Sequence, residues 1–251
     1  MTPSQFTRSL GASGLTVSPL GVGTNKWMAG KNDEQALKVF QSSLDAGVCF
    51  FDTAEVYGFG KSERLLGECL RRNERQAVIA SKFLPLPTRQ LGQALDASLS
   101  RLGLQTFDVY FIHFPLGRIE ALIDQMAQAV QKGKIRAVGV SNFSASQMHR
   151  AADRLARYNI PLAANEVQYH LLHRQPEVNG ILDACRELNV ALVAYLPLAS
   201  GRLTASLSQH APGLCGTLSC GWCSTASRKA SCNASSANWR SPSQPMSVAR
   251  T

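Results

Sequence analysis

Four side chains that can hold or move protons lie at or just beyond the ends of apolar runs in the chain: Asp52, Tyr57, Lys82 and His113. A phenol is a weak acid near neutral pH, but a neighbouring ammonium favours the phenolate and lowers the pKa of the tyrosine. A carboxylate paired with the lysine keeps the ammonium charged and in place. A histidine beside them can orient a carbonyl group by hydrogen bonding. Together these groups would form a general acid that protonates an alkoxide as hydride arrives at carbon.

The intervals between polar strand ends indicate the fold that could bring these groups together. Asp52 and Lys82 are 30 residues apart, Lys82 and His113 are 31 apart, and His113 and Ser141 are 28 apart. A strand, a helix and two short loops occupy about 30 residues, so each unit delivers one polar side chain to the same end of a parallel sheet. In a (β/α)8 barrel that end is the C-terminal face, where active sites lie.

Apolar runs bounded by turn residues predict seven strands of the βα type. The expected strands cover residues 20–24, 48–52, 77–82, 107–113, 135–140, 162–168 and 190–195. A short β-hairpin is expected over residues 6–17, where it would plug the bottom of the barrel. The expected fold class is therefore α/β, a (β/α)8 TIM-type barrel that is incomplete, with seven recognisable strands and an N-terminal hairpin.

Polar residues in front of apolar helical periods predict where several helices begin. The expected N-caps are Asp33, Ser62, Thr88 and Ser144, and further helices are expected over residues 120–132 and 176–188. Gly47, just past the first helix, fits the C-terminal glycine that ends many helices.

Two sequence patterns known from dehydrogenases are present only in part. The segment from Gly21 to Lys26 has two glycines of the dinucleotide-binding fingerprint and a lysine where the third belongs, so a doubly wound sheet is not favoured. Tyr57 and Lys61 have Tyr-x-x-x-Lys spacing, but the two intervening glycines oppose the helix that would bring them together.

The pattern of the chain changes after about residue 204. Residues 205–251 contain eleven serines and four cysteines, with no acidic residue and no amphipathic period. The expected division is therefore a barrel over 1–204 and an atypical Ser/Cys-rich tail over 205–251, of a kind produced by out-of-frame translation or by disorder.

Composition and charge exclude several classes of protein. The formal net charge of +9 is partly an effect of the acid-free C-terminal part, without a basic stripe, so nucleic-acid binding is not expected. No apolar stretch approaches the roughly 18 residues of a membrane-spanning helix, and no secretory signal opens the chain, so we expect a cytoplasmic protein. His170 and His173 lack a third ligand at suitable spacing, so no metal is expected.

Several motifs in order resemble the aldo-keto reductase family over about residues 6–204. They are the segments 8–21, 51–58 followed by Ser62-Glu63, 139–143, and Ala194-Tyr195 followed by Pro197-Leu198. The resemblance implies a barrel that reduces an aldehyde or ketone reversibly with NADP(H), acting on a small-molecule carbonyl substrate. It implies that Tyr57 is the proton donor, that Lys82 and Asp52 tune it, and that His113 orients the substrate.

The resemblance also implies a cofactor site, with departures from the family pattern. Ser141 and Asn142 match positions that hold the nicotinamide carboxamide, and Tyr195 matches the aromatic that stacks on the nicotinamide ring. Leu198 and Ser200 match cofactor-contacting positions after the seventh strand.

The sixth strand departs from the family, whose members usually have glutamine at the carboxamide-binding position. Here that position holds Glu166, and Gln168 follows two residues later on the same face. The segment that grips the adenosine 2′-phosphate is not recognisable after residue 204. An alternative therefore stays open, in which the chain is a non-catalytic, truncated or frameshifted reductase-like protein with impaired cofactor binding.

Overall fold

The computed structural model describes residues 7–29, 33–73 and 77–204. The chain divides into a unit of residues 1–208 and a unit of residues 209–251, and the second lies outside the described residues. The Ser/Cys-rich tail expected from residue 205, with its four cysteines, lies there too.

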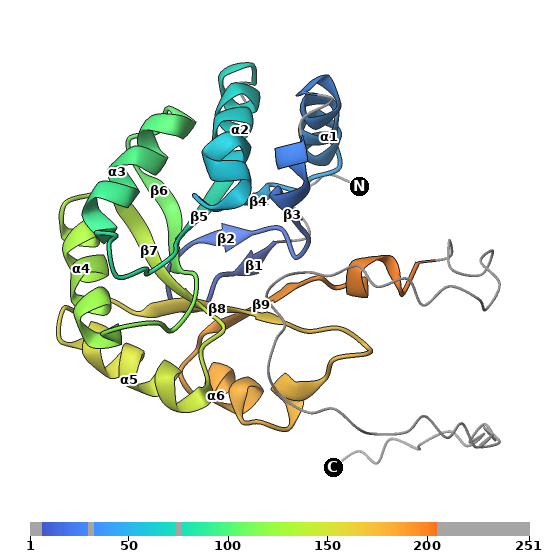
Figure 1. Ribbon diagram of the computed structural model, residues 1–251. Helices are drawn as coiled ribbons and strands as arrows, with labels where there is room; N and C mark the ends of the chain where they lie inside the picture. Colours follow the sequence, from blue (N-terminus) through green and yellow to red (C-terminus); the bar gives the residue numbers. More distant parts are fainter. Residues whose placement is uncertain (1–6, 30–32, 74–76, 205–251) are drawn as a thin grey trace, which may run out of the picture. The chain divides into compact units, whose positions relative to one another are not determined.

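Seven parallel strands form a nearly closed barrel in which each strand pairs with the next one along the chain (Figure 1). The strands are β3 (Gly21–Gly23), β4 (Phe50–Asp52), β5 (Val78–Phe83), β6 (Phe107–Ile112), β7 (Ile135–Ser141), β8 (Leu162–Gln168) and β9 (Ala191–Tyr195). This confirms the prediction of an incomplete (β/α)8 barrel with seven strands. Among the described residues, β3 and β9 each pair along one edge only.

Helices follow the strands and lie outside the sheet, side by side in chain order (Figure 1). They are α1 (Asp33–Asp45), α2 (Lys61–Arg71), α3 (Leu91–Leu102), α4 (Ile119–Gln131), α5 (Ala145–Ala156) and α6 (Ile181–Glu187). Short 3-10 helices complete the described elements: η2 (Asn25–Ala29), η3 (Tyr57–Gly60), η4 (Gln175–Glu177) and η5 (Ala199–Gly201). None of the described helices has both the length and the apolar character needed to cross a membrane.

The strands alternate their side chains between two apolar clusters, and this alternation decides which polar groups enter the barrel. In β6, Tyr110 and Ile112 pack in the larger cluster between sheet and helices, whereas Val109 and Phe111 pack in the smaller cluster inside the barrel. Ala80 of β5 also belongs to the inner cluster, so Lys82, two residues later, lies on the inner face.

The same period of two residues places the other inner groups. Phe50 of β4 and Ala164 of β8 belong to the inner cluster, so Asp52 and Glu166, two residues further on, also face inward. Polar groups therefore lie at the C-terminal end of the interior, above an apolar layer.

The N-terminal hairpin closes the other end of the interior, as expected. Strands β1 (Arg8–Ser9) and β2 (Thr16–Val17) pair antiparallel, and Leu10 and Leu15 between them pack in the inner cluster. Gly11 has φ +56°, and a Cβ atom there would lie 2.4 Å from the carbonyl oxygen of Ala163. Only glycine permits this approach of the hairpin to the start of β8.

Two of the predicted helix starts are wrong. The N-cap of α2 is Gly60, and Ser62 lies inside the first turn of the helix with its side chain buried. The N-cap of α3 is Gln90 rather than Thr88. Ser144 does cap α5, since its side chain accepts a hydrogen bond from the backbone N–H of Gln147 in a capping box.

The helix expected over residues 176–188 is divided in two. It consists of η4 and α6, because Gly180 takes a left-handed conformation, φ +82°, between them.

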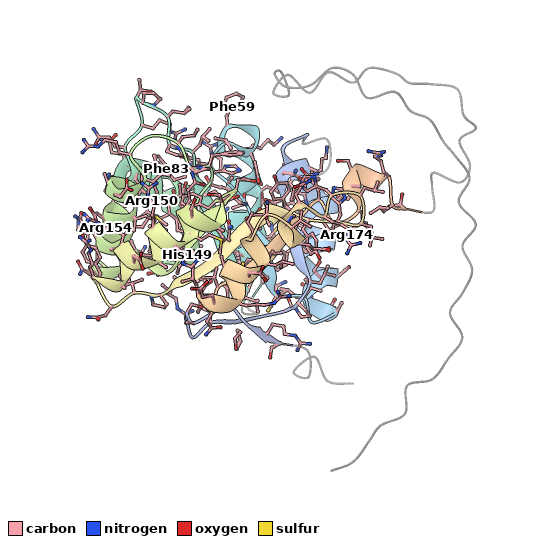
Figure 2. All side chains as sticks on the ribbon, turned by 90° about the horizontal axis from the view of Figure 1, so that it is seen from below. Phe59, Phe83, His149, Arg150, Arg154 and Arg174 are labelled. Carbon is pink, nitrogen blue, oxygen red and sulfur yellow. The ribbon has the colours of Figure 1, made fainter. Side chains whose placement is uncertain are left out.

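Ion pairs join neighbouring helices on the outer surface. Arg154 of α5 makes two hydrogen bonds to Asp124 of α4, at 2.6 and 2.5 Å, and Arg150 forms an ion pair with Glu120 across the same two helices. Arg150 and Arg154 lie along one side of α5 in Figure 2. Exposed pairs of this kind contribute little stability each, so the apolar layer beneath them holds the helices to the sheet.

Candidate active site

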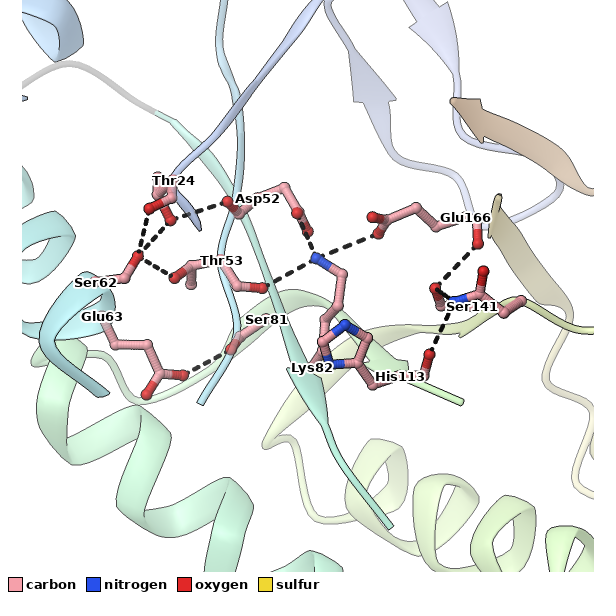
Figure 3. Close-up of polar contacts among 11 residues, drawn as sticks. Thr24, Asp52, Thr53, Ser62, Glu63, Ser81, Lys82, His113, Ser141 and Glu166 are labelled. Carbon is pink, nitrogen blue, oxygen red and sulfur yellow. Dashed lines mark hydrogen bonds and ion pairs between the residues drawn. The ribbon is translucent and has the colours of Figure 1, made fainter. Parts of the chain in front are cut away.

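Lys82 lies at the centre of the polar group inside the barrel (Figure 3). Its side chain is 0% exposed, and its ammonium forms an ion pair and a hydrogen bond with Asp52. Nζ also donates to the backbone carbonyl of Thr53 at 3.1 Å, and it lies 3.3 Å from Oε2 of Glu166. One cation thus holds two strands, β4 and β8, from its place on β5.

Tyr57 is brought over Lys82 by a tight turn after β4. Gly58 and Phe59 both have left-handed backbones, with φ of +57° and +54°, so the chain reverses within η3 and enters α2 at once. The Lys82 ammonium lies 5.3 Å from the centre of the Tyr57 ring. The His113 ring lies 5.9 Å from the same centre, edge-on at 80°. The four residues predicted to move protons therefore converge.

The structure does not lower the pKa of Tyr57 as expected. Burial raises the pKa of Tyr57 to about 12, because loss of water disfavours the phenolate more than the Lys82 ammonium favours it. The carboxylates of Asp52 and Glu166 add to the rise. Sequence reasoning counted the ammonium and omitted the burial and the second carboxylate. The phenol consequently keeps its proton throughout the neutral range.

The charges around Lys82 perturb one another strongly. Burial alone would lower the pKa of Lys82, but Asp52 and Glu166 raise it well above its usual range, so the amine stays an ammonium. Burial raises the pKa of Asp52, against the attraction of Lys82. Burial and the charge of Asp52 raise the pKa of Glu166 to about 7.

His113 is held as a neutral imidazole. Burial, and then the charge of Lys82, lower the pKa of His113 to about 3. Its Nδ1 is buried and has no hydrogen-bond partner among the described residues. A neutral imidazole carries one N–H donor, which can hydrogen-bond to a carbonyl oxygen.

A second polar group joins the ends of β7, β8 and β9. The backbone carbonyl of Glu166 accepts hydrogen bonds from Oγ of Ser141 at 3.0 Å and from the backbone N–H of Asn142 at 2.9 Å. The Asn142 side chain donates to the carbonyl of His113 at 3.2 Å and accepts from the hydroxyl of Tyr195 at 2.9 Å. Asn142 has φ +62°, a conformation that asparagine tolerates better than most residues.

The register of β8 settles which acidic or amide residue lies beside Lys82. Glu166 is level with Ser141 and reaches Lys82, whereas Gln168 is level with Tyr195 and hydrogen-bonds to His170 at 3.0 Å. Gln168 therefore does not take the place of Glu166 at the ammonium.

Leu198 and Ser200, the remaining residues expected to contact cofactor, are exposed in the turn that follows β9. Within the described chain, no hydrogen bond joins either of them to the group around Lys82. Their expected contact with cofactor stays a prediction.

Sequence reasoning missed the polar residues that support the turn carrying Tyr57. The Ser62 hydroxyl shares hydrogen bonds with the hydroxyls of Thr24, at 2.6 Å, and Thr53, at 2.9 Å. Ser62 thus links α2 to β4 and to the end of β3, where a helix cap was expected. The available signal was a cluster of hydroxyl residues on both sides of a glycine-rich turn.

Glu63 provides a second link behind the site. Its carboxylate is fully buried and accepts hydrogen bonds from Ser81 of β5 at 2.7 Å and from Arg101 of α3 at 2.6 Å. Ser81 faces the helices because it precedes the inward-facing Lys82 by one residue. The strand that carries the lysine is therefore fixed to α2 and α3 on its outer face.

The model of the aldo/keto reductase family matches residues 19–214. The chain belongs to the aldo/keto reductase family. This confirms the resemblance that the sequence motifs indicated.

Two of the relatives that the chain matches are named as reductases. The chain is 34% identical over 221 residues to the chloroplastic pyridoxal reductase of Arabidopsis thaliana, which covers 77% of the chain and 60% of that protein. It is 35% identical to the 6-dehydroglucose reductase of Novosphingobium aromaticivorans over 79% of the chain and 70% of the relative. The chain thus spans about three-fifths of the length of the chloroplastic relative.

A solved aldo/keto reductase of Klebsiella pneumoniae has the same fold, with a TM-score of 0.71 and 29% identity. The match covers 82% of the chain and 74% of that protein, whose structure contains NADP and acetate.

Proposed function

We propose that this family member reduces an aldehyde or ketone to an alcohol with NADPH and catalyses the reverse oxidation. The observation that carries the proposal is the convergence of Tyr57 and His113 over the buried Asp52–Lys82 pair. These side chains come from three different strands or the turns after them, at the C-terminal end of the barrel, where this fold places its chemistry.

The proton half of the reaction follows from the state of each side chain. The neutral His113 donates a hydrogen bond to the substrate carbonyl and orients it toward Tyr57. Tyr57 holds its proton at neutral pH and gives it to the oxygen as alkoxide character develops, because an alkoxide is a stronger base than a phenolate. The Lys82 ammonium then stabilises the tyrosinate, and Asp52 holds that ammonium in place.

The polar atoms around the site fit a nicotinamide cofactor, which supplies the hydride when bound. Asp52 Oδ1 and His113 Nδ1 are buried without a hydrogen-bond partner among the described residues, and such atoms are expected to meet a polar ligand. Family membership and the NADP bound by the Klebsiella relative support NADP(H) for this chain.

The chain's own residues can hold the nicotinamide end of the cofactor. Ser141 and Asn142 would bind the carboxamide, and the half-buried ring of Tyr195 offers a face for stacking. Glu166 would accept a carboxamide N–H where an amide side chain is usual in the family. Gln168, Leu198 and Ser200 would contact the cofactor further from the ring.

The substitution Tyr57→Phe tests the proposal. We expect it to lower the rate of NADPH-dependent aldehyde reduction by about 100-fold or more, because general acid catalysis contributes factors of that size. NADPH consumption measures turnover, and quenching of tryptophan fluorescence measures cofactor binding, which should be retained. Tyr158→Phe is the matched control and should keep full activity. The hydroxyl that it removes donates to Asp124 of α4 on the outer surface.

Two outcomes would contradict the proposal. Equal turnover by the wild type and Tyr57→Phe would exclude the tyrosine as acid. Saturable NADPH binding with no turnover of any aldehyde or ketone tested would favour the alternative of a non-catalytic reductase-like chain.

A further inference from the structure

Two carboxylates face the single ammonium of Lys82. Asp52 accepts a hydrogen bond from Nζ, whereas Oε2 of Glu166 lies 3.3 Å from Nζ as an ion pair. The side chains of Lys82, Asp52 and Glu166 are 0%, 16% and 6% exposed. The site therefore contains one positive and two potential negative charges, nearly all removed from water.

Because one ammonium faces two buried carboxyl groups, one of the carboxylates tends to bind a proton. A buried negative charge without its own cation is unfavourable, and the group protonates instead of remaining ionised. Asp52 has the direct hydrogen bond to Lys82 and is the better candidate to stay ionised. Glu166, at the longer distance, is the group that gains the proton.

We propose that Glu166 is a positioning residue whose carboxylate competes with Tyr57 for the Lys82 ammonium, and whose protonation releases Lys82 to the tyrosine. The proposal deepens the proposed function and rests on it for its effect on catalysis.

The charged and titratable groups that face Glu166 support this assignment. They come from β4, the turn after it, β5 and β9, and are Asp52, Tyr57, Lys82 and Tyr195. Only Lys82 among them is positive. Burial and the charge of Asp52 raise the pKa of Glu166 to about 7, while Lys82 opposes the rise, so the carboxyl changes charge close to neutral pH.

The direction of the effect on Tyr57 follows from the signs of the charges. The Glu166 carboxylate raises the pKa of Tyr57. It also draws the ammonium away from the phenol. Below about pH 7 a neutral Glu166 would leave Lys82 free to stabilise the tyrosinate formed in carbonyl reduction. Above that pH the reduction would slow, although Tyr57 itself still holds its proton.

Titration of tyrosine by ultraviolet absorbance tests the coupling without any substrate. In Glu166→Gln we expect the midpoint of Tyr57 ionisation to fall by about one pH unit, a tenfold change in its ionisation constant. Tyr57→Phe identifies which part of the signal belongs to Tyr57. Glu187→Gln removes an exposed carboxylate from α6 and should leave the midpoint unchanged. An unchanged midpoint in Glu166→Gln would overturn the proposal.

Kinetic profiles then separate this proposal from the proposed function. The wild-type kcat for aldehyde reduction should decline through about pH 7, and Glu166→Gln should lose that decline while KM for the aldehyde changes less than twofold. A shifted Tyr57 midpoint in a chain without any turnover would keep the coupling and refute the function. Turnover with identical midpoints and pH profiles in both proteins would keep the function and refute the coupling.

A second variant guards against a failure of folding. Circular dichroism establishes whether Glu166→Gln is folded. If it is not, Glu166→Asp carries the same test, because its shorter side chain retracts the carboxylate from Lys82 and should lower the Tyr57 midpoint in the same direction. A midpoint equal to that of the wild type in a folded Glu166→Asp would overturn the proposal.

Discussion

At the scale of single residues, Glu166 links folding stability to pH. The pKa of Glu166 is about 7 in the folded chain and near 4.5 when the side chain is exposed, so the folded state binds this proton more tightly. The resulting stabilisation is fully present below pH 4.5 and is lost as pH rises through about 7. His113 acts in the opposite sense, because its folded pKa is depressed to about 3.

A comparison of two proteins isolates the Glu166 contribution. Between pH 4.5 and 7, we expect the free energy of unfolding of the wild type to fall relative to that of Glu166→Gln, by on the order of 3 kcal/mol. The contribution of His113 is common to both proteins and cancels. Urea denaturation at several pH values measures the difference, and parallel stability curves would contradict it.

The residue scale also shows what a sequence can and cannot predict about the site. Asp52, Lys82 and His113 were predictable because apolar runs of strand length end on them at regular intervals. The raised pKa of Tyr57 was not, since burial and the nearness of Glu166 depend on how β8 is aligned with β7. Glu166 and Gln168 share a face, and only that alignment distinguishes them.

At the scale of elements, the buried Glu63 ties α2 to α3 and to β5. We expect Glu63→Gln to lower the free energy of unfolding by about 2–3 kcal/mol, because Arg101 and Ser81 lose a shared charged acceptor in a buried place. Chemical denaturation measures the loss. Glu68→Gln, on the same helix but in an exposed pair with Arg72, should change stability by about 0.5 kcal/mol or less.

If Glu63→Gln and Glu68→Gln lowered the free energy of unfolding equally, the buried contacts of Glu63 would not stabilise α2 more than an exposed ion pair does. A large effect confined to Glu63→Gln would support the view that the outer face of β5 is fixed by this carboxylate.

Helix boundaries show where local patterns give way to tertiary contacts. Ser144 caps α5 as predicted, because its partner Gln147 lies three residues away and completes the cap locally. Ser62 is also a serine near the start of a helix, but its hydroxyl hydrogen-bonds to Thr24 and Thr53. Both threonines lie outside α2. A serine in front of an amphipathic segment therefore does not by itself show whether its hydroxyl caps the helix or bonds to another element.

At the scale of the whole barrel, Gly11 joins the hairpin to the start of β8 and the segment before β9. We expect Gly11→Ala to lower the free energy of unfolding by more than about 2 kcal/mol, because the new methyl group would meet the carbonyl oxygens of Ala163 and Asn189 at 2.4 and 2.7 Å. Gly14→Ala is the matched control. It has a similarly positive φ, +75°, but open space around the added methyl group.

Thermal denaturation of the two variants measures the difference. Gly14→Ala should show only the penalty of a left-handed alanine, about 1–2 kcal/mol. If both variants lowered the free energy of unfolding equally, the hairpin would not be packed closely against Ala163 and Asn189.

The architecture was predictable at this scale because seven apolar runs of strand length alternate with amphipathic helical segments, a pattern that a parallel barrel satisfies. The prediction did not extend to contacts within the barrel. The approach of Gly11 to Ala163 joins parts of the chain that no local pattern relates.

The alternation of side chains along β5 has a consequence for how such a chain can change during evolution. Ser81 faces the helices and Lys82 faces the interior, one position apart. Deletion of a single codon within this strand would exchange the two directions and turn the ammonium into the apolar layer under the helices. Loss of two codons would preserve the parity of the strand. A point substitution in this strand therefore keeps the direction of Lys82, whereas loss of one residue does not.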